Sequence, residues 1–308
     1  MIMHLDERIT GTTVLTGLIG HPVGHTVSPL LHNSLYTAMG LDGIYLPMEV
    51  ADENLGDAVK GLKALGFAGF NVTIPYKERV MEYLDGISDD AGLFGAVNTV
   101  VNAGGRLLGY NTDGDGFARA FRRHTGAAFA GKKVCVLGAG GAARSIVFKI
   151  AMEGALAISI INRTKAKAEA LAADLTKAVR SGKVAGMAGS CGITAAAVES
   201  GTRDADLLLY DCDIIVNATS VGLYPKAAES PVRQGFGFRK GQIVFDTIYN
   251  PARTKFMADA EAMGCRACNG AGMLFYQGIG SFEIWTGKTV PPEITERLRT
   301  EFIKYLKA

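Results

Sequence analysis

The sequence predicts a two-domain α/β protein, and two features support this fold class. Short β-branched apolar runs alternate with helical patterns along most of the chain, as they do in parallel βαβ units. One of these runs, residues 132–137, leads into a glycine-rich turn that opens a helix. A chain of 308 residues is long enough for two domains of ordinary size. We expect residues 1–114 to form the first domain, completed by the C-terminal helices in 270–308, and residues 115–269 to form the second.

The first domain is expected to contain an open, mostly parallel sheet. Its helices should cover 30–39 and 54–65, with Ser28 capping the first of them and Pro29 as its first helical residue. The pair Gly104-Gly105 separates two apolar runs and indicates an antiparallel hairpin. The expected strands are residues 14–19, 44–50, 69–74, 96–101 and 106–110.

The glycine-rich turn predicts a dinucleotide-binding domain of the Rossmann type. Its sequence, Gly138-Ala139-Gly140-Gly141-Ala142-Ala143, has the spacing G-x-G-x-x-A. The first glycine allows a tight bend, the second lets the backbone approach a pyrophosphate, and the small third residue lets helix and strand touch. The helix N-terminus also offers free N–H groups to phosphates. We therefore expect the cofactor to contact Gly138, Ala139, Gly140, Gly141 and Ala142.

The residues after the next apolar run, 158–161, indicate which cofactor is bound. Sites for NAD usually place an acidic residue there, but this chain has Asn162-Arg163-Thr164 followed by Lys165 and Lys167. Arg and Lys suit a 2′-phosphate because their charges pair with it, and arginine can bond it bidentately. A basic, solvated helix start is the alternative reading. Together with the glycine turn, however, the pattern predicts NADP(H) bound at Asn162, Arg163, Thr164 and Lys167.

The rest of the second domain is expected to hold strands at 213–216 and 243–245, each followed by a polar loop on the cofactor side. Thr219 lies in the first of these loops. Residues 181–204 are poorly patterned, and we expect a loop and a helix there. The last helix, residues 292–306, has apolar residues at every fourth position and should pack through that stripe.

Composition and charge argue against several function classes. The net charge of +2 gives no reason to expect nucleic acid or a membrane surface as a partner. Five cysteines, an odd number, fit a reducing cytoplasm. Cys265 and Cys268 form a CxxC pair, but no second pair completes a zinc site. The histidines within 21–32 are interrupted by Pro22 and Gly24, so we expect no metal site there.

Several polar residues lie beyond the carboxyl ends of first-domain strands, where open α/β sheets bind ligands. A hydroxyl at Ser28 both suits a helix cap and favours a bound carboxylate. Thr73 and Lys77 follow the third expected strand, although Lys77 can equally be an ordinary solvated lysine. Asp113 precedes a helix expected from Phe117, and it can serve simply as that helix's cap.

Eight short motifs follow one another along nearly the whole chain. They are Gly20-x-Pro22-x-x-His25-Thr26-x-Ser28-Pro29-x-x-His32-Asn33, Asn71-Val72-Thr73-x-Pro75-x-Lys77, Gly95-Ala96-Val97-Asn98-Thr99, Gly109-Tyr110-Asn111-Thr112-Asp113-Gly114, the glycine turn with Arg144, Asn162-Arg163-Thr164, Asn217-Ala218-Thr219-Ser220, and Gly270-x-Gly272-Met273-x-x-x-Gln277-Gly278. Each is short, but their joint occurrence in this order is highly specific. The set resembles the shikimate dehydrogenase family, including its quinate/shikimate branch.

The resemblance implies an oxidoreductase that interconverts 3-dehydroshikimate and shikimate with a nicotinamide cofactor, in the chorismate pathway of aromatic amino-acid biosynthesis. It implies that Lys77 and Asp113 do the proton work, and a lysine ammonium near an aspartate is suited to that task. It also implies that the substrate carboxylate meets Thr26 and Ser28. Ring hydroxyls are implied at Thr73, Asn98, Asp113 and Gln277, a further substrate position at Tyr249, and the nicotinamide end at Gly270 and Met273.

Two positions, Thr26 and Thr164, bear on the alternatives that stay open. Thr26 stands where the family usually has Ser, and the quinate-using branch varies there, so use of both shikimate and quinate stays open. Thr164 stands where members that accept NAD tend to be acidic, which favours NADP(H), with NAD(H) possible. We expect an NADPH-dependent shikimate dehydrogenase. The alternatives are a quinate/shikimate dehydrogenase that uses NAD or NADP, and a non-catalytic binding or regulatory homologue. The chain is expected to be a monomer or a homodimer.

Overall fold

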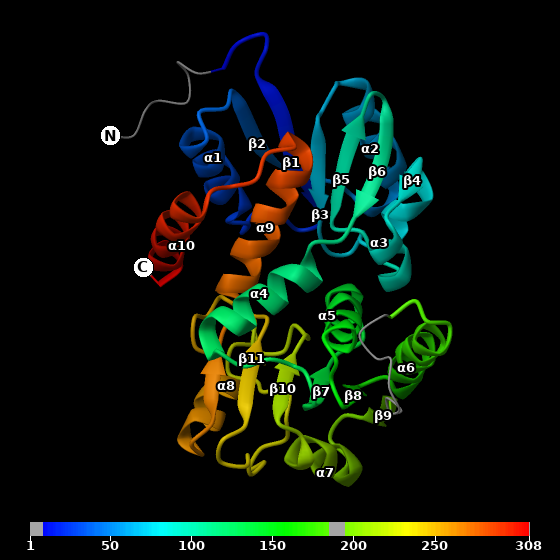
Figure 1. Cartoon of the computed structure of the whole chain (residues 1–308), viewed down its shortest axis with the longest axis vertical. Helices are drawn as coiled ribbons and strands as arrows, with labels where there is room; N and C mark the ends of the chain where they lie inside the picture. Colours follow the sequence, from blue (N-terminus) through cyan, green and yellow to red (C-terminus); the bar gives the residue numbers. More distant parts are fainter. Residues whose placement is uncertain (1–8, 185–194, 308) are drawn as a thin grey trace. The chain divides into compact units, whose positions relative to one another are not determined.

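The computed structural model describes residues 9–184 and 195–307, and the chain divides into two compact units. Unit 1 contains the chain up to Thr112 together with Gln277–Tyr305, and unit 2 contains Asp113–Tyr276 together with the chain from Leu306 onward. Each unit is built on a six-stranded sheet with helices packed against it (Figure 1). The predicted α/β fold class is therefore confirmed.

The sheet of unit 1 is mostly parallel, as predicted. Its strands are β1 (Val14–Gly20), β2 (Gly43–Glu49), β3 (Gly69–Val72), β4 (Gly86–Ile87), β5 (Thr99–Ala103) and β6 (Arg106–Tyr110), in the order β2-β1-β3-β5-β6-β4. The β1 strand runs parallel to β2 and β3, while β5 runs antiparallel to both of its neighbours. The β5–β6 pair is the predicted hairpin, and both glycines of its turn have positive φ. Thr73 lies just past the end of β3 and not within it.

The helices of unit 1 begin slightly away from the predicted positions. They are α1 (Ser28–Ala38), the 3₁₀ turns η2 (Asp52–Asn54) and η3 (Arg79–Tyr83), α2 (Leu55–Ala64), α3 (Asp89–Phe94) and α10 (Pro292–Lys307). The prediction that Ser28 caps α1 was wrong, because Val27 occupies the cap position and makes no side-chain cap bond. Ser28 therefore lies in the first turn, where its hydroxyl contacts Thr26 instead. The first turn also tolerates Pro29, whose missing N–H has no helical partner there.

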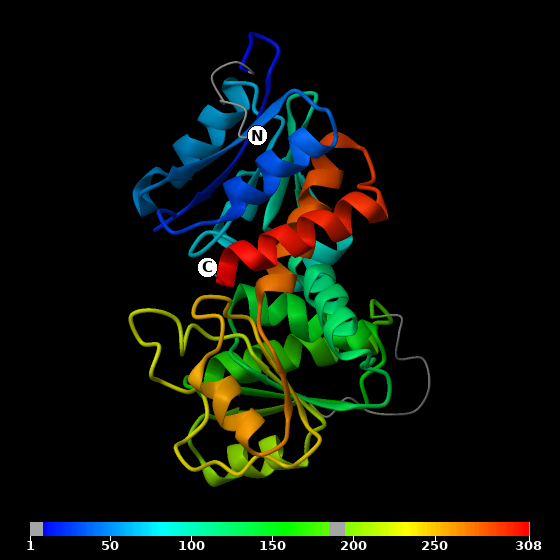
Figure 2. The same ribbon diagram turned by 90° about the vertical axis from the view of Figure 1, so that its left-hand side faces the viewer.

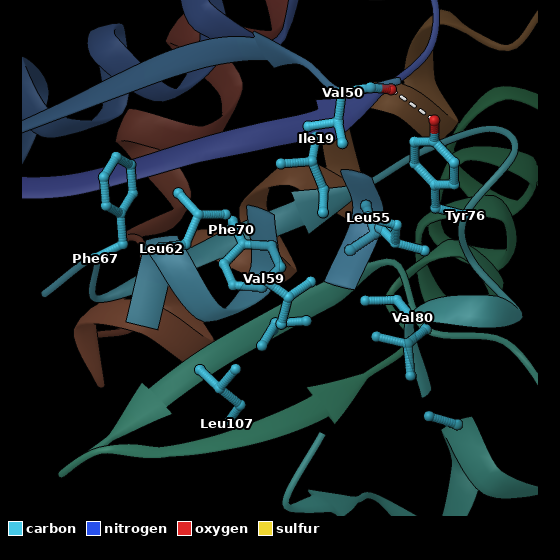
Figure 3. Packing of buried hydrophobic residues seen from close by; sticks show 14 residues of the cluster. Ile19, Val50, Leu55, Val59, Leu62, Phe67, Phe70, Tyr76, Val80 and Leu107 are labelled. Atoms are coloured by element: carbon cyan, nitrogen blue, oxygen red, sulfur yellow. Dashed lines mark hydrogen bonds between the residues drawn. The ribbon is translucent and has the colours of Figure 1, made fainter. Parts of the chain in front are cut away.

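Successive side chains of β1 point to opposite faces of the sheet, so they pack into two separate apolar clusters of unit 1. Ile19 packs with Leu55, Val59 and Leu62 of α2 in the main core cluster (Figure 3). Leu18, one residue earlier, packs on the opposite face with Tyr45 and Trp285. The α1 and α10 helices lie side by side and share a surface groove lined by Leu30, Leu31, Ser34, Leu298, Glu301, Phe302 and Tyr305 (Figure 2).

The sheet of unit 2 is fully parallel across the strands that the structure describes. They are β7 (Lys133–Leu137), β8 (Ala157–Asn162), β9 (Ala195–Glu199), β10 (Ile214–Asn217), β11 (Ile243–Asp246) and β12 (Arg266–Cys268), in the order β12-β11-β10-β7-β8-β9. The strand order changes direction between β7 and β10, which is the Rossmann arrangement. The helices are α4 (Asp113–Thr125), α5 (Gly141–Met152), α6 (Lys165–Arg180), α7 (Arg203–Asp211), α8 (Lys255–Ala262) and α9 (Ala271–Thr286), the last of which continues into unit 1.

Two expectations for unit 2 were wrong, and one strand was not predicted. The Ala-rich segment Ala195–Glu199 forms the edge strand β9 and not a helix, because it pairs in parallel register with β8. Residues 185–194 of the same expected loop lie outside the described residues. The α4 helix begins at Asp113, four residues before the expected start at Phe117. The CxxC segment lies at β12, a strand that the sequence patterning missed.

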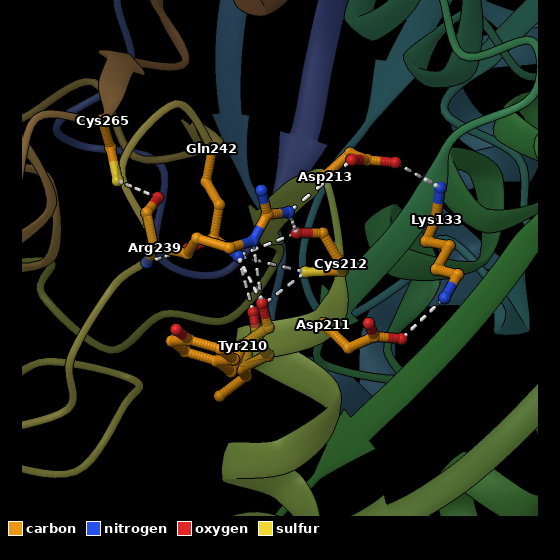
Figure 4. Close-up of polar contacts among 9 residues, drawn as sticks. Lys133, Tyr210, Asp211, Cys212, Asp213, Arg239, Gln242 and Cys265 are labelled. Carbon is orange, nitrogen blue, oxygen red and sulfur yellow. Dashed lines mark hydrogen bonds and ion pairs between the residues drawn. The ribbon is translucent and has the colours of Figure 1, made fainter.

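The amino ends of the unit 2 strands are held by a polar network around the buried side chain of Gln242 (Figure 4). Gln242 Nε2 donates to the carbonyl oxygens of Leu209 and Cys212, both at 2.8 Å, and Arg239 also donates to Cys212 O at 2.9 Å. The Asp213 carboxylate accepts from the backbone N–H of Lys133 at 3.0 Å. These bonds lie at the sheet edge opposite the glycine turn, so they stabilise the fold and leave the carboxyl edge available for ligands.

Candidate active site

In unit 1, four of the predicted substrate residues lie in two loops that flank a topological switch point. The chain goes from β1 to β2 on one side and later returns to β3 on the other side of β1. Loops at the carboxyl ends of such strands form ligand-binding crevices in open α/β sheets. Thr26 and Ser28 follow β1, and Thr73 and Lys77 follow β3. The fold therefore brings these four predicted residues to one region of the sheet edge.

The two loops are joined directly at their bases. Thr73 N donates to Ile19 O at 3.0 Å, and His21 N donates to Ile74 O at 3.0 Å. Gly20 lies under this junction, because a Cβ atom there would lie 2.3 Å from Cγ2 of Thr73. A side chain at position 20 would therefore displace Thr73, and the contact explains the glycine.

Lys77 is held through its backbone and its neighbour. Val97 N donates to Lys77 O at 2.8 Å, which fixes Lys77 next to the segment that carries Asn98. The preceding residue, Tyr76, is fully buried, and its hydroxyl donates to Val50 O at 2.6 Å. The half-buried Lys77 side chain thus projects from an anchored turn.

A chain of hydroxyl contacts connects the β1 loop to the sheet. Thr26 Oγ1 donates to Ser28 Oγ at 3.2 Å, so the two predicted carboxylate-binding hydroxyls lie together. Tyr45 Oη donates to Asn71 Oδ1 at 2.8 Å. Burial raises the pKa of Tyr45 well above its usual range, and a side-chain hydrogen bond with Ser28 partly opposes this rise. The Tyr45 phenol therefore stays neutral and links Ser28 to Asn71.

Asn98 and Gln277, which are far apart in sequence, meet in unit 1. Asn98 Nδ2 donates to Gln277 Oε1 at 3.3 Å and to Thr112 Oγ1 at 2.9 Å. Asn98 Oδ1 accepts from the backbone N–H of Thr112 at 2.8 Å and from Thr99 Oγ1 at 2.9 Å. Both predicted amides therefore belong to one polar cluster, which we call the Asn98 cluster. Its members are Asn71, Asn98, Thr99, Thr112, Gln277 and Ser281.

His32 contributes a neutral ring to the same region. It is completely buried and stacks on Tyr45, with ring centroids 4.2 Å apart. Burial lowers the pKa of His32 to about 3, against a smaller opposing effect of the Asn71 side chain. An imidazole that stays uncharged at neutral pH serves here as an aromatic packing element.

The second predicted catalytic residue, Asp113, belongs to unit 2. It is the first residue of α4 and is 4% exposed. The following Gly114 packs against α5, where an added Cβ would lie 3.0 Å from Ser145 O. Asp113 is thus fixed by close packing of α4 on α5. Its pairing with Lys77 stays a prediction.

The glycine turn in unit 2 has the conformation that its sequence predicts. Gly138 has a φ of +115° and its added Cβ would lie 2.9 Å from Ala218 O, so both the backbone and its neighbour require glycine. Gly140 is the N-cap of α5 and makes no side-chain cap bond. The first N–H groups of α5 therefore face the carboxyl edge of the sheet, as an anion site requires.

The residues that follow β8 give this edge positive charge. Arg163, Thr164 and Lys167 are exposed, with Thr164 as the N-cap of α6. Asn162 Nδ2 donates to Thr164 O at 3.0 Å, which shapes the turn that presents Arg163. The neighbouring Arg144 is engaged elsewhere, because it pairs with Asp174 at 2.8 Å. The arrangement suits a phosphate group beside the first turn of α6.

The loops after β10 and β11 are tied together. Thr219 Oγ1 donates to Asn217 Oδ1 at 2.7 Å, and Asn217 Nδ2 donates to Asp246 Oδ1 at 3.0 Å. The Asp246 carboxylate also accepts from Thr254 Oγ1 at 2.7 Å and from Ile248 N at 3.0 Å. Burial raises the pKa of Asp246 to about 6, although all three hydrogen bonds favour its charged form. This network positions the Thr219 loop against the loop that carries Tyr249.

The last predicted residues lie at the start of α9. A Cβ on Gly270 would lie 1.9 Å from Thr247 O, so the chain passes too close for any side chain. Gly270 N donates to Ile248 O at 3.0 Å. Met273 is buried and Tyr249 is half-buried, with the pKa of Tyr249 raised by burial. Gly270 thus joins α9 to the Tyr249 loop.

The described residues form neither a cluster of metal ligands nor a membrane-spanning helix. Within residues 9–184 and 195–307, no three His, Cys, Asp or Glu side chains gather as metal ligands would. Cys265 and Cys268 are both buried, and burial raises the pKa of Cys268 to about 12, which makes that thiol unreactive. Among the helices of the described chain, none is long and apolar enough to cross a membrane.

Sequence reasoning missed several residues that support the site. Tyr45, Asn71, Thr112, Ser281 and Asp246 carry no predicted role, yet each bonds to a loop or amide of the predicted site. One signal was available for Ser281, because it follows Gln277 by four residues and residues at this spacing share a helix face. The contact of Tyr45 with Asn71 depends on strand order, which no local pattern reveals.

Comparison with known proteins agrees with this geometry. Family models match as "Shikimate dehydrogenase substrate binding domain" over residues 18–100, "Shikimate / quinate 5-dehydrogenase" over 120–188 and "Shikimate 5'-dehydrogenase C-terminal domain" over 270–298. A shikimate dehydrogenase (NADP⁺) from Methanopyrus kandleri is 43% identical over 302 residues, which cover 98% of this chain and 100% of that protein.

Solved structures give the same result. A shikimate dehydrogenase in complex with NADP⁺ matches with a TM-score of 0.84 and 39% identity, covering 96% of this chain and 97% of the other. A quinate dehydrogenase from Corynebacterium glutamicum in complex with NAD matches with a TM-score of 0.80 and 27% identity, covering 95% of this chain and 99% of the other. The chain therefore belongs to the shikimate dehydrogenase family.

Proposed function

We propose that this protein reduces 3-dehydroshikimate to shikimate, reversibly, with NADPH. The observation that carries the proposal is the placement of the predicted substrate residues in unit 1. Thr26, Ser28, Thr73 and Lys77 flank one switch point, and the Asn98 cluster supplies amides and hydroxyls in the same unit. Such a site suits a polyhydroxylated carboxylic acid, because each ring hydroxyl needs a polar partner when it is buried.

The residues of unit 2 fit a nicotinamide dinucleotide phosphate. The glycine turn and the first N–H groups of α5 suit a pyrophosphate, and Arg163 with Lys167 suits a 2′-phosphate. Thr219, Gly270 and Met273 would lie toward the nicotinamide. We accordingly propose that unit 1 is the substrate domain and unit 2 the cofactor domain, with the expected boundaries near residues 114 and 270.

The mechanism assigns the proton work to Lys77 and Asp113. The cofactor supplies a hydride to the carbonyl carbon when it is bound. The Lys77 ammonium hydrogen-bonds the carbonyl oxygen, stabilises the negative charge that develops there and gives up a proton to it. Asp113 holds the ammonium and a substrate hydroxyl in position. Acid–base help of this kind typically contributes roughly 10²–10⁴-fold to the rate.

The carboxylate of the substrate takes no part in the reaction, so the protein needs only to hold it in place. The paired hydroxyls of Thr26 and Ser28 lie at the N-terminus of α1, where the helix dipole also favours an anion. Thr73, Tyr249 and Gln277 complete the proposed contacts to the ring. Gly20 supports this arrangement because it lets the β1 and β3 loops meet.

The experiment compares kcat/KM for shikimate and quinate, each with NADP⁺ and with NAD⁺. We expect the highest value for shikimate with NADP⁺. Equal or better turnover of quinate with NAD⁺ would contradict the proposal and favour the quinate/shikimate dehydrogenase alternative. No turnover of either acid with either cofactor would favour the non-catalytic homologue.

The proposal includes a cellular location and an oligomeric state for the protein. We place the enzyme in the cytoplasm because Cys135, Cys212, Cys265 and Cys268 are free thiols, as a reducing compartment maintains them. The expected assembly is a monomer or a homodimer, and light scattering of the purified protein distinguishes the two.

A further inference from the structure

The Ser281 hydroxyl lies at the centre of the Asn98 cluster. Asn71 Nδ2 donates to Ser281 Oγ at 2.9 Å, and the hydroxyls of Thr99 and Thr112 lie 2.8 and 3.3 Å from it. Ser281 also reaches the carbonyl oxygen of Gln277, one turn earlier in α9, at 3.1 Å. Ser281 and Thr99 are both fully buried. One hydroxyl of α9 therefore meets side chains from three other segments of unit 1.

The chemistry of donors and acceptors gives these bonds a direction. The amide oxygen of Asn98 carries no hydrogen, so Thr99 Oγ1 donates to it across the 2.9 Å contact. A hydroxyl has one hydrogen, and Thr99 must then accept from Ser281. The 2.8 Å contact of Ser281 with Thr99 is also shorter than its 3.1 Å contact with the Gln277 carbonyl. Hydrogen bonds thus run one way, from Asn71 through Ser281 and Thr99 to Asn98.

The backbone N–H of Thr112, which can only donate, sets which way the Asn98 amide points, and the direction of the other bonds reinforces it. Its oxygen faces Thr99 and the Thr112 N–H, so its nitrogen faces Thr112 Oγ1 at 2.9 Å and Gln277 Oε1 at 3.3 Å. The contact with Gln277 is the longer of the two and exchanges more readily for a ligand oxygen. Asn98 is therefore prepared to offer an N–H donor to a ring hydroxyl.

We propose that Ser281 is a positioning residue that, together with the Thr112 N–H, holds the orientation of the Asn98 amide and, with it, the hydrogen-bond pattern offered to the substrate ring. The proposal rests on the proposed function, because it takes Asn98 and Gln277 as substrate-binding amides. Without the Ser281 hydroxyl, Thr99 keeps only the longer contact from Asn71 Nδ2, at 3.2 Å, as a donor that makes it give its own hydrogen to Asn98. The Thr112 N–H still holds the Asn98 oxygen, but the amide is then held less firmly and offers its N–H to the ligand less precisely.

The test compares Ser281→Ala with Thr286→Ala. The control removes a hydroxyl of the same helix that contacts the carbonyl oxygen four residues earlier, at 2.8 Å, but lies outside the Asn98 cluster. We expect S281A to raise the KM for shikimate about tenfold, with the KM for NADP⁺ and the Tm close to those of T286A. Ser281→Cys keeps the size and a weak donor, so it should give an intermediate KM and replaces S281A if that variant does not fold.

A double variant shows whether Ser281 acts through Asn98. Asn98→Ala/Ser281→Ala should have the same KM for shikimate as Asn98→Ala alone, because the amide to be oriented is gone. A full additional loss in the double variant would overturn the proposal, as would equal KM values for S281A and T286A.

An NMR measurement tests the role of Ser281 independently of whether the protein turns over shikimate. In ¹H–¹⁵N spectra of the ligand-free protein, S281A should shift the side-chain amide resonances of Asn98 and speed their hydrogen exchange, whereas T286A should leave them in place. Unchanged Asn98 resonances in S281A would overturn the positioning role even in an enzyme that turns over shikimate. Shifted resonances in a protein that does not turn over shikimate would support the amide orientation and contradict the proposed function.

Discussion

The Asp246 carboxylate accepts a hydrogen bond from Asn217 Nδ2 at 3.0 Å and so joins the ends of two neighbouring strands, β11 and β10. Asn217 in turn holds Thr219, and Asp246 holds the backbone of Ile248 next to Tyr249. One buried carboxylate thus sets the spacing of two loops that we assign to cofactor and substrate. Its protonation state consequently affects the stability of this edge.

Asp246 should make unit 2 less stable as the pH rises from about 4 to about 6. The pKa of Asp246 is raised from 3.8 to about 6 in the folded protein. In this window the folded state binds more protons than the unfolded state, so the free energy of unfolding falls as the pH rises. A shift of this size corresponds to up to about 3 kcal/mol. Asp246→Asn should abolish this component of the pH dependence.

The measurement is the hydrogen-exchange opening free energy of the β10 and β11 amides at several pH values. The difference between D246N and wild type should grow in favour of the variant from pH 4 to pH 7. Asp259→Asn is the matched control, because it removes an exposed carboxylate of α8 that pairs with Lys255. Parallel pH profiles for wild type and D246N would contradict the prediction, because they would show that the pKa of Asp246 is the same in the folded and unfolded states.

His32 predicts the opposite pH dependence in unit 1. Its folded pKa of about 3 lies below the ordinary value of 6.5, so below pH 6.5 the unfolded state binds the extra proton. The free energy of unfolding should therefore fall as the pH drops from 6.5 to 3, by up to about 5 kcal/mol. His32→Phe keeps an aromatic ring on Tyr45 and should remove most of this acid sensitivity.

The single tryptophan reports on this change. Trp285 lies 5.1 Å from the His32 ring, so denaturant unfolding followed by its fluorescence measures the unit that contains His32. The exposed His25 provides the control, and His25→Gln should keep the wild-type acid slope. An unchanged slope in H32F would mean that His32 is not the group responsible.

The strands and the glycine turn could be predicted because their signals are local. Apolar runs predicted β1, β2, β7 and β8 to within one or two residues, and the turn at Gly138 required its positive φ. The edge strand β9 was missed because Ala195–Glu199 carries no β-branched pattern except Val198. The segment forms a strand because it pairs in parallel register with the free edge of β8. Propensity alone favoured a helix there, and tertiary pairing decided otherwise.

The supporting residues of the site could not be predicted for a different physical reason. Ser281, Asn71 and Thr99 are distant in sequence, and their contacts exist only once α9 packs against β3 and β5. The resemblance to the family named Asn98 and Gln277 as substrate residues but gave no role to the groups that bond to them. The roles of Lys77 and Asp113, like those of the other proposed site residues, stay predictions for the experiments proposed here.

Gly20 should be essential for placing Thr73. In Gly20→Ala, the new methyl would lie 2.3 Å from Thr73 Cγ2 and 3.1 Å from both Ile74 O and Val23 Cγ1. Because Thr73 must move, we expect the KM for shikimate to rise about tenfold or more. Gly24→Ala is the control, since nothing lies within 4 Å of its added Cβ. Steady-state kinetics with saturating NADP⁺ measure both, and equal KM values would contradict the proposed contact of Thr73 with substrate.

Arg163 should determine the preference for NADP⁺. Arg163→Ala removes an exposed guanidinium at the start of α6, and we expect the KM for NADP⁺ to rise roughly 10- to 100-fold. The KM for NAD⁺ should change less than about twofold, because that cofactor has no 2′-phosphate to lose a partner. Arg180→Ala, at the other end of the same helix, should leave both values unchanged. Similar losses for both cofactors in R163A would argue against a phosphate contact.

Lys77 is the centre of the proposed mechanism, and the variant Lys77→Ala tests it most directly. The decisive measurement is the kcat of this variant together with its dissociation constant for shikimate, compared with Lys60→Ala, which removes an exposed lysine of α2. The account predicts a loss of kcat of roughly 10²-fold or more, a dissociation constant within about threefold of wild type, and an unchanged Lys60→Ala enzyme. A Lys77→Ala enzyme with wild-type kcat would contradict it.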